Sequence, residues 1–163
     1  MFNNAYKNRR IFLTGHTGFK GSWLCLWLEQ LGATVVGFSN EVPTEPAHFN
    51  LLTLSNVTDQ RGDIRNYQAL HAAITASKPD LVFHMAAQPL VRASYNIPLE
   101  TMETNVMGTA NVLQACRNQP SIKGVIVVTS DKCYENKEKP VRYVETDPMG
   151  GHDPYSASKG CAE

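Results

Sequence analysis

Two side chains near the end of the sequence, Tyr155 and Lys159, have the types and the spacing of an acid–base pair. Four residues apart on a helix, they would face the same way. A nearby ammonium stabilises a phenolate, so such a tyrosine can take a proton near neutral pH. An ordinary surface pair at helical spacing is the alternative interpretation, and the segments that precede the pair decide between the two.

A glycine-rich segment near the start of the sequence follows a short apolar run. Gly15, Gly18 and Gly21 are spaced as G-x-x-G-x-x-G, and a helical pattern comes directly after them. Glycines permit a tight turn and let backbone N–H groups approach a pyrophosphate, whose charge the amino terminus of the helix favours. No Gly-Lys-Ser/Thr follows, so the segment is not a P-loop. A structural turn is the alternative, but the position between strand and helix predicts a dinucleotide site.

A third group of candidates, Ser130, Asp131 and Lys132, follows the most apolar run of the chain, residues 124–129. A hydroxyl, a carboxylate and an amine would then lie at the carboxyl edge of a sheet, where ligands of α/β folds bind. A serine at this place can hydrogen-bond a substrate hydroxyl beside the tyrosine. For Asp131 and Lys132 a solvated turn is the alternative.

The elements that must position these residues alternate along the chain. Strands are predicted at residues 10–14, 34–38, 60–63, 80–85 and 124–129, and helices at 22–31, 67–76 and 99–118, with a further helix beginning near 154. Buried apolar strands that alternate with helices predict an α/β fold with a doubly wound parallel sheet, Rossmann-type and NAD(P)-binding. We expect the strand order 3-2-1-4-5, with the glycine loop at the switch point.

Three side chains on these elements are assigned to the core. Trp23 and Trp27 lie at helical spacing in the first predicted helix, which is typical of core packing. His84 ends a buried strand and is expected to be a hydrogen-bonded core histidine rather than a ligand.

Composition limits the function classes. The chain has 163 residues, 42% of them hydrophobic, which is enough for one domain with a core. Lys+Arg and Asp+Glu are 15 each, so no basic surplus indicates a nucleic-acid partner. The cysteines fit no zinc pattern and are expected to be free thiols in a reducing cytoplasm, and the histidines suggest no metal cluster. Neither a signal peptide nor a membrane span is visible.

The residue that would hold the adenosine ribose departs from the usual pattern. An acid is expected about 20 residues after the glycine loop, and Ser39 stands there. Asn40 and Glu41 are the candidate substitutes. No arginine at this position offers to hold a 2′-phosphate, and the choice between NAD and NADP stays open.

Taken together, the glycine loop, residues 83–88, Ser130 and the Tyr155/Lys159 pair resemble the extended short-chain dehydrogenases. Residues 15–24, 86–92, 104–109 and 129–134 are similar to the NAD-dependent sugar-nucleotide dehydratases of that family. Ser-Asp-Lys at 130–132 resembles the branch that acts on CDP-glucose, because related dehydratases have Thr-Asp-Glu there and epimerases generally lack the acidic pair. An epimerase or another 4,6-dehydratase of the family is the alternative.

The resemblance implies a lyase that converts CDP-glucose to CDP-4-keto-6-deoxyglucose in deoxysugar and O-antigen precursor synthesis. Tyr155 would take the proton of the sugar C4 hydroxyl while the C4 hydride passes to NAD. Asp131 would be the acid at the C6 hydroxyl, and Lys132 stands where the base at C5 is expected. The hydride would then return to C6. Ser130 would orient the C4 oxygen, and Lys159 would assist the tyrosine and hold a ribose hydroxyl.

The resemblance also implies where the cofactor lies. The implied cofactor-binding residues are Gly15, Thr17, Gly18, Phe19, Gly21, Asp63, Ile64, Ala86, Ala87, Gln88, Tyr155 and Lys159. Among them Asp63 and Ile64 would border the adenine, and the segment 86–88 would line the nicotinamide. Asn105 is expected to be structural near the active site. Arg92 either begins the substrate region or is a surface cation.

Members of this family are expected to run to roughly twice this length, with a smaller carboxyl-terminal domain for the sugar nucleotide. The 163 residues are therefore expected to be an NAD-binding Rossmann domain, truncated before the substrate domain. Such a piece is expected to bind NAD weakly, to lack turnover and to self-associate through its uncovered sheet edge. The full-length form is expected to be a cytoplasmic homo-oligomer without nucleic-acid or membrane partners.

Overall fold

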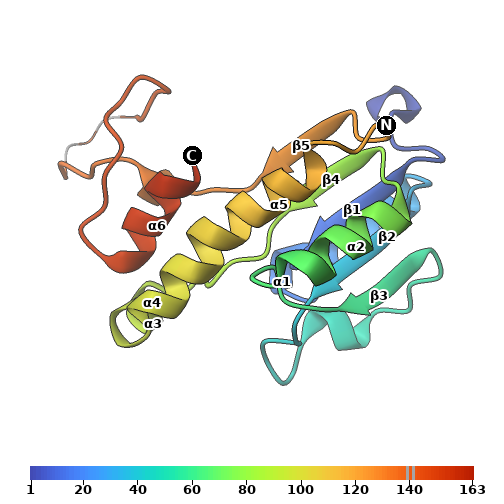
Figure 1. Ribbon diagram of the computed structural model, residues 1–163, viewed down its shortest axis with the longest axis horizontal. Helices are drawn as coiled ribbons and strands as arrows, with labels where there is room; N and C mark the ends of the chain where they lie inside the picture. Colours follow the sequence, from blue (N-terminus) through green and yellow to red (C-terminus); the bar gives the residue numbers. More distant parts are fainter. Residues whose placement is uncertain (139, 141) are drawn as a thin grey trace.

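The computed structural model describes residues 1–138, 140 and 142–163, and a parallel sheet runs through its centre (Figure 1). The strands are β1 (Arg10–Thr14), β2 (Thr34–Ser39), β3 (Val57–Arg61), β4 (Leu81–His84) and β5 (Gly124–Val127). Their order is β3-β2-β1-β4-β5, and every pair is parallel. The predicted doubly wound sheet and its strand order are confirmed, with the switch point between β1 and β4.

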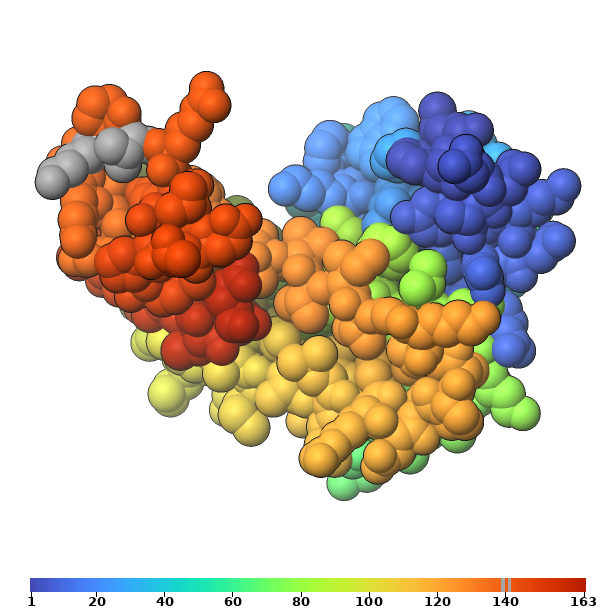
Figure 2. Space-filling model, turned by 90° about the horizontal axis from the view of Figure 1, so that it is seen from above, coloured from blue at the N-terminus to red at the C-terminus, as the bar shows by residue number. Residues whose placement is uncertain are grey.

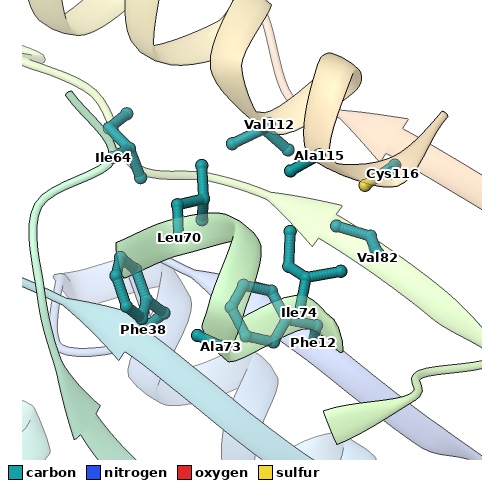
Figure 3. Packing of buried hydrophobic residues seen from close by; sticks show 10 residues of the cluster. All are labelled: Phe12, Phe38, Ile64, Leu70, Ala73, Ile74, Val82, Val112, Ala115 and Cys116. Carbon is teal, nitrogen blue, oxygen red and sulfur yellow. The ribbon is translucent and has the colours of Figure 1, made fainter. Parts of the chain in front are cut away.

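Successive side chains along each strand point to opposite faces of the sheet, so the core has two layers. Ile11 and Leu13 of β1 pack with Cys25 and Leu28 on one side of the sheet. Phe12 faces the opposite side, where two further helices cover the sheet (Figure 3). That second cluster consists of Phe12, Phe38, Ile64, Leu70, Ala73, Ile74, Val82, Val112, Ala115 and Cys116.

An α-helix follows β1, β3 and β4 within a few residues. The first three are α1 (Phe19–Gln30), α2 (Tyr67–Ser77) and α3 (Val91–Asn96). Helix α1 begins three residues before its predicted start because Gly18, in an extended conformation, already serves as its N-cap. The side chain of Asn66 caps α2 by accepting from Ala69 N at 3.1 Å. Helix α3 was not predicted, since Pro89 and Pro98 on either side of it obscure a short pattern.

The two tryptophans are not in the core, so that prediction was wrong. Trp23 is 50% exposed and stacks on His48 at 4.2 Å, and Trp27 is 45% exposed and meets Phe2 edge-on at 5.5 Å. The face of α1 that packs on the sheet carries smaller side chains, which allow the helix to lie close to the strands. Its buried residues are Gly21, Ser22, Cys25 and Leu28.

The helix predicted at 99–118 is replaced in the structure by three consecutive helical segments. These are α4 (Pro98–Met102), the π-helical turn η3 (Glu103–Met107) and α5 (Gly108–Cys116). The start of α5 can lie close to Ile64, which follows β3, because Gly108 has no side chain: a Cβ there would lie 2.5 Å from Ile64 Cδ1. A π-helical turn places an extra residue in the path and often marks a functional site.

The third strand starts earlier than predicted, at Val57 instead of residue 60, because its side chains are mostly exposed and give no apolar signal. The chain also forms the short turns η1 (Phe2–Asn4), η2 (His48–Leu51) and η4 (Asp131–Cys133), and ends in α6 (Pro154–Ala162). The segment from η4 onward stands at one end of the molecule, and the surface is hollowed between it and the light-blue residues near 40 (Figure 2). Among the described residues, no helix is long and apolar enough to span a bilayer.

Candidate active site at the carboxyl edge of the sheet

The glycine loop is shaped by close backbone contacts. Gly15 has φ +77°, a conformation that favours glycine, and a Cβ there would lie 2.6 Å from Ala86 N. On Gly21 a Cβ would lie 2.1 Å from Gly15 O. Gly18 differs, because the nearest atom to its Cβ would be Gly15 O at 3.4 Å and the remaining space is open. Two glycines therefore fold the loop, and the third keeps the space before α1 clear.

This open space suits a pyrophosphate. No side chain among the described residues caps α1, so the first N–H groups of the helix stay available. The positive end of the helix dipole points to the same place. Phe19 is 73% exposed, and its backbone rather than its ring belongs to this turn. The residues present thus fit the phosphates of a dinucleotide.

Thr17 contributes to the loop's position. Its buried hydroxyl donates to Glu41 O at 2.5 Å, and its N–H lies 3.5 Å from Ser39 Oγ. Both contacts tie the glycine loop to the end of β2. The hydroxyl of Ser39 also lies 2.9 Å from Nδ1 of the buried His16. Burial lowers the pKa of His16, while its hydrogen bond to Asp59 acts in the opposite direction.

The two residues predicted at the adenine use their side chains elsewhere. Both carboxylate oxygens of Asp63 accept from Arg65, whose Nη2 lies 2.6 Å away, and these hydrogen bonds hold the pKa of Asp63 below its usual value. Ile64 is buried in the α2–α5 core layer. Both side chains are therefore already engaged, and the backbone of these residues is what they could offer to an adenine.

The segment 86–88 lies directly beside the glycine loop. Thr14 Oγ1 accepts from Met85 N at 3.1 Å and from Ala86 N at 3.2 Å. Ala87 follows in the half-buried turn, and Gln88 donates through Nε2 to Thr101 Oγ1 at 2.9 Å. The first and fourth strands thus present their ends as one surface, where the nicotinamide is expected to lie.

His84 is the hydrogen-bonded core histidine that was predicted. Thr109 donates to Asn105 O at 2.6 Å, so its oxygen accepts from His84 Nε2 at 2.9 Å. Thr14 can then donate to His84 Nδ1 at 2.7 Å. These partners assign the neutral tautomer with the proton on Nε2. Burial, together with the charge of Lys159, lowers the pKa of His84 to about 4.

Asn105, in the π-helical turn, joins two parts of the site. Its Oδ1 accepts from Gln88 N at 2.8 Å, and its Nδ2 donates to Gln88 O at 3.1 Å and to Ser158 Oγ at 2.8 Å. With 1% of its surface exposed, it forms these bonds out of contact with water. It therefore fixes the segment 86–88 to the helix that carries Tyr155.

Tyr155 and Lys159 lie on one side of α6, whose N-cap Asp153 accepts from Ser156 N at 2.9 Å. They are 9% and 7% exposed, and the ammonium of Lys159 lies 6.0 Å from the centre of the Tyr155 ring. Lys159 Nζ also lies 3.5 Å from Val128 O, just past β5. Burial, together with the charge of Lys20, lowers the pKa of Lys159. A buried pair is not the ordinary surface pair that was the alternative.

Ser130, Asp131 and Lys132 turn around the end of β5. Ser130 Oγ donates to Asp131 Oδ1 at 3.1 Å and accepts from Lys132 N at 3.2 Å. Asp131 and Lys132 are exposed, yet both line a cavity of about 200 Å³ that reaches Ser156 on α6. Tyr134 and Tyr143, stacked at 4.9 Å, form part of its wall. Arg92 is exposed on α3 and does not line this cavity.

The structure brings the predicted residues to one edge of the sheet, in two neighbouring groups. The glycine loop, the segment 86–88 and the Tyr155/Lys159 pair form one group, and Asp131 and Lys132 face the cavity next to it. Sequence reasoning did not identify Thr14 and Thr109 as partners of His84, nor Asp59 as a partner of His16. The available signal for Thr14 was its hydroxyl at the end of a run of apolar strand residues.

Comparison with known proteins identifies the family of this chain. Residues 12–163 match the family model described as GDP-mannose 4,6 dehydratase. The chain is 52% identical over 161 residues to the CDP-glucose 4,6-dehydratase of Salmonella typhimurium, an alignment that covers 98% of this chain and 45% of that enzyme. The chain thus spans about half the length of the curated relatives it matches.

Solved structures show the same architecture. Epimerase Mth375 from Methanothermobacter thermautotrophicus superposes with a TM-score of 0.87 at 24% identity, over 98% of this chain and 46% of the other, which shows the fold alone. A UDP-glucose 4-epimerase from Brucella ovis, solved in complex with NAD, has a TM-score of 0.78 at 27% identity, over 94% of this chain and 45% of the other.

Proposed function

Because the chain belongs to the family that the GDP-mannose 4,6-dehydratase model describes, we propose that it forms the NAD-binding and proton-transfer domain of a CDP-glucose 4,6-dehydratase. The predicted membership in the sugar-nucleotide dehydratases is confirmed by that match and by the similarity to the Salmonella enzyme. One observation carries the proposal. The buried Tyr155/Lys159 pair is anchored through Asn105 to the segment beside the glycine loop.

The dinucleotide would lie along the carboxyl edge of the sheet. The N–H groups before α1 would bind its pyrophosphate, and the segment 86–88 would face its nicotinamide. When bound, NAD supplies a hydride acceptor that is regenerated within one turnover. The open side of Gly18 and the uncapped turn of α1 support this assignment.

Tyr155 would take the proton of the C4 hydroxyl of the sugar. The ammonium of Lys159 stabilises the phenolate that this role requires, and the carbonyl of Val128 keeps that ammonium in place. Ser130 would orient the C4 oxygen from the end of β5. Its hydroxyl now bonds to Asp131, so it would exchange that contact for one to the sugar.

Asp131 and Lys132 would carry out the elimination of water. The ketone at C4 acidifies the hydrogen on C5, so a base at C5 and an acid at the C6 hydroxyl are needed. Asp131 would donate the proton to the leaving hydroxyl. Lys132 would act as the base in its neutral form, which a substrate covering this exposed pair would favour by removing water.

A nucleotide-sugar epimerase is the second candidate, since UDP-glucose 4-epimerases are 34% identical to this chain. Epimerisation uses the tyrosine–lysine pair but requires no acid at C6. The position of Asp131 and Lys132 together on the cavity wall favours the dehydratase. We further propose that the enzyme is a cytoplasmic homo-oligomer whose product enters deoxysugar and lipopolysaccharide synthesis.

The test is an assay of the full-length enzyme with NAD and, separately, CDP-glucose, dTDP-glucose, UDP-glucose and GDP-mannose. The proposal expects a 4-keto-6-deoxy product from CDP-glucose and much slower conversion of the others. An epimerised sugar without loss of water would support the second candidate. Conversion of another nucleotide sugar in preference to CDP-glucose would overturn the substrate assignment.

A further inference from the structure

An arginine lies at the adenosine end of the proposed site, although its position in the sequence does not indicate this. Ser39 ends β2 where an acid is usual, and its direct partner in the neighbouring strand β3 is Arg61. Residues 39–41 contain no arginine, as the sequence analysis stated, but strand pairing brings Arg61 beside Ser39. Adjacent strands lie about 4.8 Å apart, so residues distant in sequence share this edge.

The side chain of Arg61 is 40% exposed, but it already has a charged partner. Its Nη2 lies 2.6 Å from Asp59 Oδ2, and its guanidinium lies over the ring of Phe49, 5.7 Å from the ring centre. Asp59 and Arg61 are two residues apart in β3 and so project from the same face of the strand. The carboxylate and the aromatic ring together determine where the guanidinium lies.

Asp59 is itself held by a buried group. His16 Nε2 lies 2.9 Å from the other carboxylate oxygen, Oδ1. His16 is fully buried and meets Phe49 edge-on at 5.2 Å. Because one carboxylate oxygen is bound by a fixed ring, the ion pair with Arg61 is more ordered than a pair between two free surface side chains.

An arginine beside the end of the second strand is the group that accommodates the 2′-phosphate of NADP in Rossmann-type sites. Here the charge that would attract the phosphate is paired with Asp59, whose carboxylate accepts from one guanidinium donor, Nη2. Ser39 adds no charge and bonds to His16.

We propose that Asp59 is a specificity-determining residue for the dinucleotide, which withholds Arg61 from a 2′-phosphate and so makes the chain favour NAD over NADP. This inference rests on the proposed function, because it requires that a dinucleotide binds at this edge. It goes beyond that function by naming the residue pair that selects between the two cofactors.

The experiment measures the dissociation constants of NADH and NADPH by their fluorescence on binding to the parent protein and to four variants. Asp59→Asn keeps an acceptor for His16 but removes the charge, and Arg61→Gln is made both alone and in the Asp59→Asn background. Asp80→Asn is the matched control, since Asp80 also pairs with cations, Arg9 and Lys123, but at the opposite edge of the sheet. 2′,5′-ADP and 5′-AMP repeat the comparison without the nicotinamide.

The parent protein is expected to bind NADH more tightly than NADPH. Asp59→Asn should tighten NADPH about tenfold, the worth of one charge-assisted hydrogen bond, and change NADH less than about threefold. Adding Arg61→Gln should remove that gain, and Asp80→Asn should leave both constants unchanged. Arg61→Gln alone should not weaken NADPH selectively, because the guanidinium is already engaged by Asp59.

Several results would overturn the proposal. If Asp59→Asn folds and keeps the parent's ratio of the NADPH and NADH dissociation constants, then the Asp59–Arg61 pair is an ordinary surface contact that does not select the cofactor. A gain that survives Arg61→Gln would exclude Arg61 as the phosphate ligand. If Asp59→Asn fails to fold, a selective weakening of NADPH binding by Arg61→Gln would still refute the proposal that Arg61 is kept away from the 2′-phosphate. Binding of neither dinucleotide to the folded parent protein would instead overturn the proposed function.

Discussion

The side-chain amide of Asn105 lies 2.8 Å from the hydroxyl of Ser158, although the two residues are 53 positions apart in the chain. Ser158 immediately precedes Lys159 on α6, and the same amide group is bonded to both backbone groups of Gln88. A single buried side chain therefore sets the distance between the segment 86–88 and the helix that carries Tyr155. The π-helical turn that carries Asn105 points it into this position.

Replacing Asn105 with Ala is expected to lower both stability and turnover. The change leaves the backbone groups of Gln88 and the hydroxyl of Ser158 without their buried partner, which costs about 1–3 kcal/mol of unfolding free energy. Urea unfolding and steady-state kinetics measure the two effects. Asn118→Ala, at an exposed position past α5, is the control. Equal behaviour of the two variants would show that Asn105 is not the link.

Substitutions of two glycines should separate folding from cofactor binding. A Cβ on Gly21 meets Gly15 O at 2.1 Å, so Gly21→Ala is expected to destabilise the fold. Gly18 faces open space, so Gly18→Val is expected to melt near the parent temperature yet weaken NADH at least about tenfold by filling the phosphate site. Thermal melts measure the stability of the two variants, and NADH fluorescence measures their cofactor binding. Unimpaired NADH binding by Gly18→Val would place the pyrophosphate elsewhere.

His84 is expected to make stability depend on pH. Its pKa is about 4 in the folded chain against 6.5 for an ordinary histidine, so between these values the unfolded chain binds the proton and the folded chain does not. Stability is therefore full above pH 6.5 and falls as the pH drops toward 4, by about 3 kcal/mol from this group. Urea unfolding across this range measures the slope.

In His84→Gln the slope should be shallower than in the parent, because glutamine does not titrate. The control is His71→Gln, at an exposed position of α2, which should keep the parent slope. A His84→Gln slope identical to that of the parent would mean that His84 does not remain neutral in the folded chain.

Lys132→Glu is expected to move the pH–rate profile of the enzyme. A carboxylate beside Asp131 makes it harder to ionise both acids, so one of the two apparent pKa values of the new pair rises. The acidic limb of the profile should shift upward in pH. Lys137→Glu, an exposed change on the following loop, is the control. Superimposable profiles for Lys132→Glu and the parent would make Lys132 a bystander.

The sheet could be predicted because its signals are local. Apolar runs at β1, β4 and β5 and the glycines after β1 sufficed for the topology. The tryptophans failed because helical spacing does not tell which face of a helix is buried. On α1, the small residues Gly21 and Ser22 pack against the sheet and leave Trp23 outside.

The site was predicted only where its residues form a motif. The Tyr155/Lys159 pair and the glycine loop carry their spacing in the sequence. The contacts of His84 with Thr14 and Thr109 join separate elements, so no residue spacing in the sequence predicts them. The same holds for Arg61, which lies beside Ser39 only because β3 pairs with β2 in this register.

The central claim is an internal redox cycle in which Tyr155 starts the transfer of hydride from C4 and the same hydride returns to C6. The direct measurement is the conversion of CDP-glucose carrying deuterium at C4, with the product examined by NMR. The account predicts that the deuterium appears at C6 of a 4-keto-6-deoxy sugar, and that Tyr155→Phe slows this conversion by ~10²–10⁴-fold while NADH binding is kept. Deuterium that remains at C4 or is lost to water would contradict it.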